Sequence, residues 1–224
     1  MFGVIFDMDG VLVDSYGPHF ESWQGMAAER GLSVTEEQFG ATFGRTSRES
    51  MITFWGHGRY SDEQIRQMDH RKEELFREIL ARRMPIMPGA RELLAALREA
   101  GFRLAVGSSA PPENLKVVLS HFEGDVFDAV VSGADVDRGK PDPQVFVTAA
   151  ARLRIPPEWC AVIEDAPAGI QAAQAAGAAC IGLASTGRTR ESLAEADLVV
   201  DQLSQLSPAK VAEVIEAHIR SCNE

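Results

Sequence analysis

Two short acidic segments of this sequence contain the residue types that a metal-binding site needs. Asp7 and Asp9 lie in the run DMDG at residues 7–10, and Glu164 adjoins Asp165 much later in the chain. Carboxylates that converge repel one another unless a hard cation neutralises them, and Mg²⁺ prefers oxygen ligands. If the two segments meet in space, we expect them to bind Mg²⁺ through Asp7, Asp9, Glu164 and Asp165.

Three further residues could hold a phosphate group beside that metal. Ser108 and Ser109 offer hydroxyl and backbone amide donors, and Lys140 offers a fixed positive charge. With Mg²⁺ and Lys140 drawing a phosphate dianion close, Asp7 could attack the phosphorus and become an aspartyl-phosphate. Asp9, two residues further on, should point the same way and could transfer protons.

Each of these segments also has an ordinary structural interpretation. Asp and Gly favour turns, a serine pair often caps a helix, and the run KPDP at residues 140–143 is typical of the start of a helix. An adjacent Glu and Asp often form an exposed acidic turn. The chemical interpretation therefore depends on whether the surrounding elements bring the segments together.

Apolar runs that alternate with helical stretches predict a doubly wound parallel α/β sheet. The runs are short and consist mostly of Val, Ile, Leu and Ala, as expected of strands covered on both faces. Helical stretches separate them, most clearly residues 88–100, where three leucines recur at helical spacing before Gly101. The predicted strands are 3–6, 103–107, 129–132, 161–163, 179–183 and 198–200, and the other predicted helices are 112–120, 143–153, 168–176 and 208–219.

The carboxyl ends of these strands are where a parallel open sheet binds its ligands. Asp7 and Ser108 directly follow two predicted strands, Lys140 follows a third after a short loop, and Glu164 and Asp165 follow a fourth. Chance would seldom place all four segments at one sheet edge. The sequence therefore predicts a shared phosphate-transfer site rather than unrelated turns.

Residues 16–84 interrupt this pattern with helical stretches and no comparable strand. The expected helices are 16–30, 35–41, 47–55 and 61–82. We therefore expect a catalytic core formed by residues 1–15 and 85–224, and an inserted helical cap domain formed by residues 16–84 that could hinge over the sheet.

These segments resemble the four motifs of the haloacid dehalogenase superfamily. The resemblance rests on the run DMDGVLVDS at residues 7–15, Ser108 after a strand, GKPDP at 139–143 and VIEDAPAGI at 162–170. It implies a Rossmann-like core and Mg²⁺ as cofactor. The helical insert is similar to the cap of the subgroup that contains β-phosphoglucomutase and many phosphatases of small metabolites.

The resemblance also implies a role for each matching residue. Asp7 would be nucleophile and metal ligand, Asp9 a general acid and base whose backbone carbonyl contacts Mg²⁺, and Asp165 a metal ligand with Glu164 beside it. Ser108 and Lys140 would hold the phosphate. An Asp at position 9 disfavours the dehalogenase and phosphonatase branches, which lack that acid.

Four cap residues are candidate substrate contacts, each with an alternative. His19 and Trp23 share a helix face, as in the His-Phe-x-x-Trp stretch of β-phosphoglucomutase, or simply pack inside the cap. Lys72 falls on an apolar stripe formed by Ile65, Met68, Leu75 and Ile79, and either extends outward or reaches the substrate. Arg48 could bind a second anionic group or belong to a helix start capped by Ser47.

Net charge, cysteine content and the lack of targeting signals restrict the expected cellular location and the expected binding partners. A net charge of −11 disfavours nucleic acid and anionic membranes as partners, and three scattered cysteines, interpreted as packing residues, predict neither disulfides nor a zinc site. Without a signal peptide or a membrane span we expect a cytoplasmic monomer that acts on a small phosphorylated metabolite. Hydrolysis of a sugar phosphate is favoured over a phosphohexose mutase, while an intact acidic set argues against a binding protein without chemistry.

Overall fold

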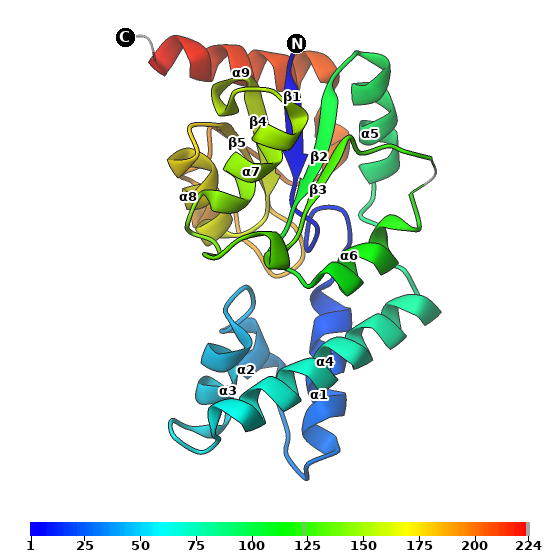
Figure 1. Ribbon diagram of the computed structural model, residues 1–224, viewed down its shortest axis with the longest axis vertical. Helices are drawn as coiled ribbons and strands as arrows, with labels where there is room; N and C mark the ends of the chain where they lie inside the picture. Colours follow the sequence, from blue (N-terminus) through cyan, green and yellow to red (C-terminus); the bar gives the residue numbers. More distant parts are fainter. Residues whose placement is uncertain (123, 223–224) are drawn as a thin grey trace. The chain divides into compact units, whose positions relative to one another are not determined.

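The computed structural model describes residues 1–122 and 124–222, and the chain divides into two compact units (Figure 1). One unit comprises Met1–Asp14 and Ile86–Glu224, and is called the sheet unit below. The other, Ser15–Pro85, is called the helical unit. Each has its own hydrophobic cluster of buried side chains.

The sheet unit contains a parallel sheet in the strand order β3-β2-β1-β4-β5-β6. Strand order reverses between β1 and β4, as in doubly wound folds. The predicted fold class is therefore confirmed. The strands among the described residues are β1 (Gly3–Phe6), β2 (Arg103–Gly107), β3 (Ala129–Val131), β4 (Cys160–Glu164), β5 (Ala179–Leu183) and β6 (Leu198–Val200).

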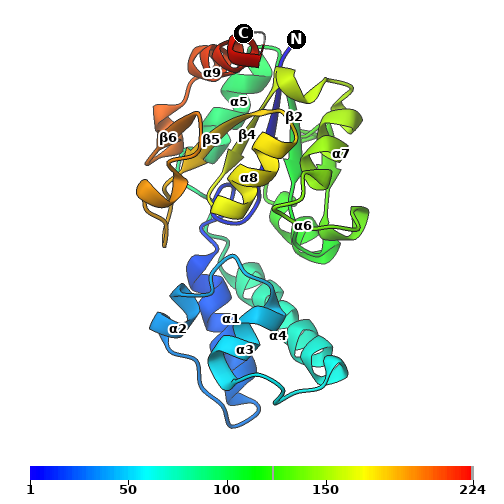
Figure 2. The same cartoon turned by 90° about the vertical axis from the view of Figure 1, so that its left-hand side faces the viewer.

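Helices cover both faces of this sheet (Figure 2). Helices α7 (Gln144–Leu153) and α8 (Pro167–Ala175) pack on one face, and α5 (Ala90–Glu99) and α9 (Pro208–Cys222) pack on the other. Every residue of β1, β4 and β5 is buried as a result. Helix α6 (Pro112–Leu119) and short 3₁₀ turns complete the unit: η1 (Gly133–Asp135), η2 (Pro157–Trp159), η3 (Glu191–Leu193) and η4 (Leu203–Gln205).

The chain leaves and re-enters the sheet unit through two segments that bond to each other. Val13 and Ile86 form an isolated antiparallel bridge, and the Met87 amide donates to the Leu12 carbonyl at 2.9 Å. The far end of the loop after β1 is thereby bonded to the segment where the chain re-enters the sheet unit.

The helical unit consists of α1 (Tyr16–Ala28), α2 (Glu36–Gly40), α3 (Ser47–Trp55) and α4 (Asp62–Arg82). Capping boxes begin α2, α3 and α4. The cap of α3 is Thr46, so the prediction of a cap at Ser47 is wrong by one residue; the Ser47 hydroxyl donates instead to Asp69. Threonine accepts from the third helical amide because its extended backbone places the hydroxyl there.

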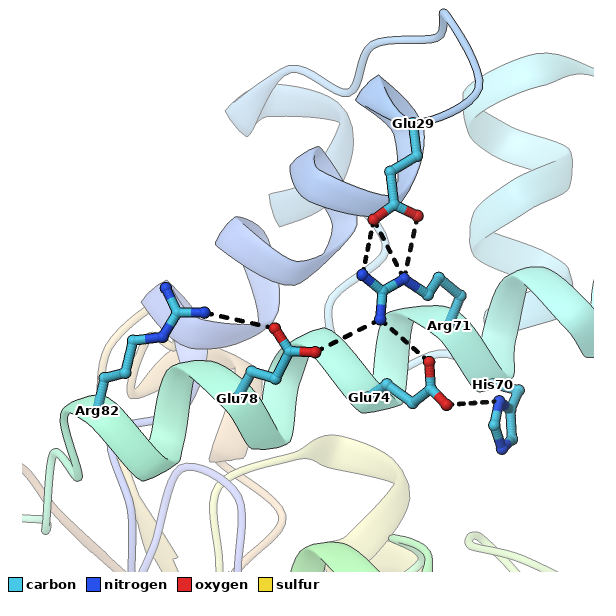
Figure 3. A network of polar contacts seen from close by, with 6 residues as sticks. All are labelled: Glu29, His70, Arg71, Glu74, Glu78 and Arg82. Atoms are coloured by element: carbon cyan, nitrogen blue, oxygen red, sulfur yellow. Dashed lines mark hydrogen bonds and ion pairs between the residues drawn. The ribbon is translucent and has the colours of Figure 1, made fainter.

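A polar network joins α1 to α4 along the surface of the helical unit (Figure 3). Arg71 forms the centre of the network, donating to Glu29 at 2.8 Å and to Glu74 at 3.1 Å. Glu78, Arg82 and His70 extend it along α4. The paired guanidinium and carboxylate fix the rotation of α4 against the end of α1.

The cysteines and the helices bear on two further expectations. Cys160 and Cys180 are free and buried, as packing residues should be, but Cys222 is exposed, because it lies in the last turn of α9. Over the described part of the chain, no helix combines the length and apolar character that crossing a membrane requires.

Candidate active site

The adjacent central strands β1 and β4 place Asp7 beside Glu164. Phe6 pairs with Ile163 in the parallel register, and the Asp7 amide donates to the Ile163 carbonyl at 3.0 Å. The next residue on each strand is therefore a carboxylate at the same sheet edge. Both are buried, Asp7 with 6% of its surface exposed and Glu164 with 1%.

Lys140 bridges these two carboxylates. Its Nζ donates to Asp7 Oδ1 at 2.8 Å and to Glu164 Oε1 at 2.7 Å, although it comes from the loop before α7. Burial by itself would lower the pKa of Lys140, but the charges of Asp7 and Glu164 outweigh burial and raise it. Lys140 is therefore a permanent positive charge at this edge.

Asp165 completes a group of three buried carboxylates. One oxygen each from Asp7, Glu164 and Asp165 can be chosen so that all lie within 4.8 Å of one another. Burial is the largest cause that raises the pKa of Asp7 well above its ordinary value, against the charge of Lys140. Burial and the neighbouring Glu164 raise the pKa of Asp165 to about 7. A buried set of oxygen donors with this excess negative charge fits a divalent cation such as Mg²⁺.

Backbone groups and two glycines fit closely around this group. The Ala166 amide donates to Glu164 Oε2 at 2.7 Å. A Cβ on Gly169 would lie 1.8 Å from Glu164 Oε1, and a Cβ on Gly10 would lie 2.3 Å from Asp165 Oδ2. The motif glycines therefore leave the space that the carboxylates occupy.

Asp9 lies in the tight loop that follows β1. The Gly10 amide donates to the Val13 carbonyl at 2.8 Å, and the charge of Asp9 is the smallest of the causes that raise the pKa of Asp7. The group of three carboxylates does not include Asp9. Two metal contacts are predicted for Asp9, one through its carboxylate and one through its backbone carbonyl, and both stay predictions.

The two serines follow β2 but differ in exposure. Ser108 is 2% exposed, its amide donates to the Val131 carbonyl, and its hydroxyl accepts from the Ala110 amide at 3.1 Å. Ser109 is exposed. Neither caps a helix, because α6 begins at Pro112 with Pro111 as its cap residue. The ordinary interpretation of this pair is therefore wrong.

The four cap candidates separate into a buried group and an exposed residue. Lys72 is 5% exposed, with its Nζ 2.8 Å from His19 Nδ1 and 2.7 Å from Glu73 Oε1. The His19 ring stacks on Phe76 at 3.9 Å, and Trp23 is buried in the hydrophobic cluster of the helical unit. Arg48 does not join them, because it pairs with Asp62 on the surface.

Arg188 is a site residue that the motifs do not indicate. Its Nε donates to Asp165 Oδ2 at 3.2 Å, and the pair is buried, with side chains 12% and 5% exposed. The rule that ligands bind beyond the carboxyl ends of strands could have found it, since it lies five residues after the end of β5.

Comparison with known proteins gives the family. A family model described as haloacid dehalogenase-like hydrolase matches residues 3–177. The chain belongs to this family. It is 34% identical to β-phosphoglucomutase of Bacillus subtilis (strain 168) over 214 residues, covering 92% of each protein. It is also 33% identical to validoxylamine A 7′-phosphate phosphatase of Streptomyces hygroscopicus subsp. limoneus over 210 residues, covering 90% of this chain and 94% of that protein.

Solved structures of the same family share the fold. The crystal structure of β-phosphoglucomutase from Clostridium difficile superposes with a TM-score of 0.85 at 27% identity, covering 98% of this chain and 99% of that one. The resemblance inferred from the four motifs is therefore confirmed.

Proposed function

We propose that this member of the haloacid dehalogenase-like hydrolases is a Mg²⁺-dependent phosphatase of small phosphorylated metabolites, with sugar phosphates as the substrate class. The observation that carries the proposal is the position of Asp7. Its carboxylate lies at the end of the central strand, 2.8 Å from Lys140 Nζ, in the same group as Glu164 and Asp165. Relatives that act on phosphorylated compounds give the substrate class.

In the proposed reaction Asp7 is the nucleophile. Its oxygen forms a bond to phosphorus as the bond from phosphorus to the leaving oxygen breaks, and Asp9 gives that oxygen a proton. Water then attacks the aspartyl-phosphate, Asp9 takes a proton from it, and the bond from Asp7 to phosphorus breaks to release inorganic phosphate. Lys140 and the Ser108 and Ser109 segment hold the phosphate oxygens.

Asp7, Glu164, Asp165 and the backbone carbonyl of Asp9 would hold the metal ion. When bound, Mg²⁺ supplies positive charge that lets a phosphate dianion approach a carboxylate. Lys140 supplies a second positive charge from the protein itself. The helical unit would select the rest of the substrate through His19 and Lys72, with Trp23 shaping that group and Arg48 as a further candidate.

A second candidate is phosphohexose mutation, which shares the first step. It differs only in the acceptor, a sugar hydroxyl in place of water, and the likeness to β-phosphoglucomutase in sequence and structure favours it. Asp7 has the same role in both reactions, so the assay has to identify the acceptor.

The test is phosphate release from a panel of sugar phosphates with Mg²⁺ or with EDTA. We expect Mg²⁺-dependent release from at least one ester, a loss of about 10³-fold or more in Asp7→Asn, and no change in the exposed control Asp125→Asn. No release from any ester, together with conversion of β-glucose 1-phosphate to glucose 6-phosphate, would replace the phosphatase by the mutase. Lys72→Met should alter the ranking of the esters, and an unchanged ranking would remove that residue from substrate selection.

A further inference from the structure

The loop at residues 184–190, between β5 and η3, carries Arg188 to the metal-ligand candidate Asp165. The guanidinium contacts Oδ2 through Nε at 3.2 Å, and both side chains are largely buried. An arginine cannot lose its charge in a protein, so this contact is a permanent positive charge against one member of the carboxylate group.

Several bonds fix the loop that carries this arginine. The Thr186 hydroxyl donates to Asp14 Oδ2 at 3.0 Å, which ties the loop to the segment that follows β1. The Arg188 amide donates to the Ser185 carbonyl at 3.0 Å. Arg190 bonds the Val199 carbonyl and Asp201 on the other side. The arginine is therefore held at Asp165 from both ends of the loop.

Two buried cations contact different members of the group of three carboxylates. Lys140 bonds Asp7 and Glu164, while Arg188 bonds Asp165. Removing one partner of a buried ion pair is strongly destabilising. In the metal-free protein the Arg188 charge therefore stabilises the buried carboxylate of Asp165. A divalent cation that binds the same group must approach this guanidinium and is repelled by it.

We propose that Arg188 is a positioning residue that acts through Asp165: it stabilises the metal-free site and weakens Mg²⁺ binding, so that occupancy follows the Mg²⁺ concentration. The proposal rests on the proposed function for its metal site. Asp165 is already confined by burial and by the close approach of Gly10, so loss of the arginine leaves the ligand in place and removes a repelling charge.

The test compares three variants of the full chain without substrate. Arg188→Met removes the charge, Arg188→Lys keeps it, and Arg190→Met is the matched control, because Arg190 pairs with Asp201 and not with a carboxylate of the site. Isothermal titration with MgCl₂ at pH 8.5, above the pKa of about 7 of Asp165, keeps this carboxylate ionised and gives the Kd. Thermal unfolding in EDTA gives the Tm of the metal-free protein.

We expect Arg188→Met to bind Mg²⁺ about tenfold more tightly than wild type and to have a lower Tm in EDTA, since one repelling charge is gone and Asp165 has no partner. Arg188→Lys should restore both values towards wild type, and Arg190→Met should leave the Kd unchanged. A merely structural role would lower the Tm without tightening Mg²⁺ binding.

Equal or weaker Mg²⁺ binding by Arg188→Met overturns the proposal, as does a wild-type protein that binds no Mg²⁺. Should the Met variant fail to fold, Arg188→Gln, which is neutral but can still donate to Asp165, carries the same expectation for the Kd. Phosphate release is measured separately, so a protein that binds Mg²⁺ as expected but releases no phosphate would refute the proposed function and leave this inference standing.

Discussion

Gly10 affects both the backbone conformation of the loop after β1 and the space available to a carboxylate of the site. Its φ of +75° lies in the left-handed region that favours glycine, and a Cβ there would lie 2.3 Å from Asp165 Oδ2. Two separate costs therefore oppose any other residue at this position: backbone strain, and displacement of a carboxylate of the site.

Gly10→Ala should separate these costs when it is compared with Gly177→Ala. Gly177 has a similar φ of +77°, but a Cβ there would meet no atom within 4 Å apart from those of its neighbours along the chain. Both variants should lose about 1 kcal/mol of unfolding free energy from backbone strain. Gly10→Ala alone should also lose Mg²⁺ affinity and phosphatase activity, measured by titration and phosphate release. Equal Mg²⁺ affinity in the two variants would contradict the close fit of Gly10 against Asp165.

At the residue scale the sequence predicts which carboxylates lie together better than it predicts which arginines pair with acidic residues. Asp7, Glu164 and Asp165 could be placed together because each follows a strand in one parallel sheet, and the structure brings them to one group. Arg188 could not be assigned in advance, because its place depends on the path of an irregular loop. Arg48 is a similar case, since its ion pair with Asp62 depends on how two helices pack.

At the scale of the elements, Asp128, the residue before β3, connects β2 and α5. Its Oδ2 accepts from the Leu104 amide of β2 at 2.9 Å and from Arg98 of α5 at 2.6 Å, and its Oδ1 accepts from Arg103. Burial tends to raise the pKa of Asp128, but these donors outweigh burial and lower the pKa below its ordinary value. A carboxylate with a lowered pKa stabilises the fold above its unfolded-state pKa.

Asp128→Asn should therefore destabilise the protein at pH 7 by about 1 kcal/mol, because the residue is exposed and solvent screens hydrogen bonds to its charge. The difference from wild type should shrink as pH falls through the folded-state pKa of Asp128, because the wild-type carboxyl then loses its charge too. Urea unfolding at pH 7 and at about pH 3, below the ordinary pKa, measures this. The exposed neighbour Asp125→Asn is the control, and a gap as large at low pH would contradict a charge-based role.

Element boundaries could be predicted where burial or a cap defines them. The predictions for residues 3–6, 103–107, 179–183 and 198–200 agree with β1, β2, β5 and β6, because apolar runs in a covered sheet have sharp ends. The 3₁₀ turns were missed, since short irregular turns have no periodic signal. In α4 the predicted apolar stripe is buried at Ile65 and Met68, and Lys72 lies on it as expected. Leu75 and Ile79 are only half-buried, because the face continues through Phe76 and Leu80.

At the scale of the whole molecule, the carboxylate group belongs to a single unit. Asp7, Glu164 and Asp165 all lie in the sheet unit, while the helical unit has a hydrophobic cluster of its own that includes Trp23 and Met26. The chain passes between the units only at residues 14–15 and 85–86. A ligand that binds the carboxylate group therefore stabilises the sheet unit directly.

Amide hydrogen exchange with and without Mg²⁺ should show that difference. At 100 times its Kd, Mg²⁺ adds about 3 kcal/mol to the unit that binds it, so amides of β1 and β4 should exchange more slowly, while those of α2 and α3 should not change. Asp165→Asn is the control and should reduce the effect on β1 and β4. Equal slowing in α2 and α3 would show instead that the two units open together, because a ligand of one unit protects the other only if both unfold in a single cooperative step.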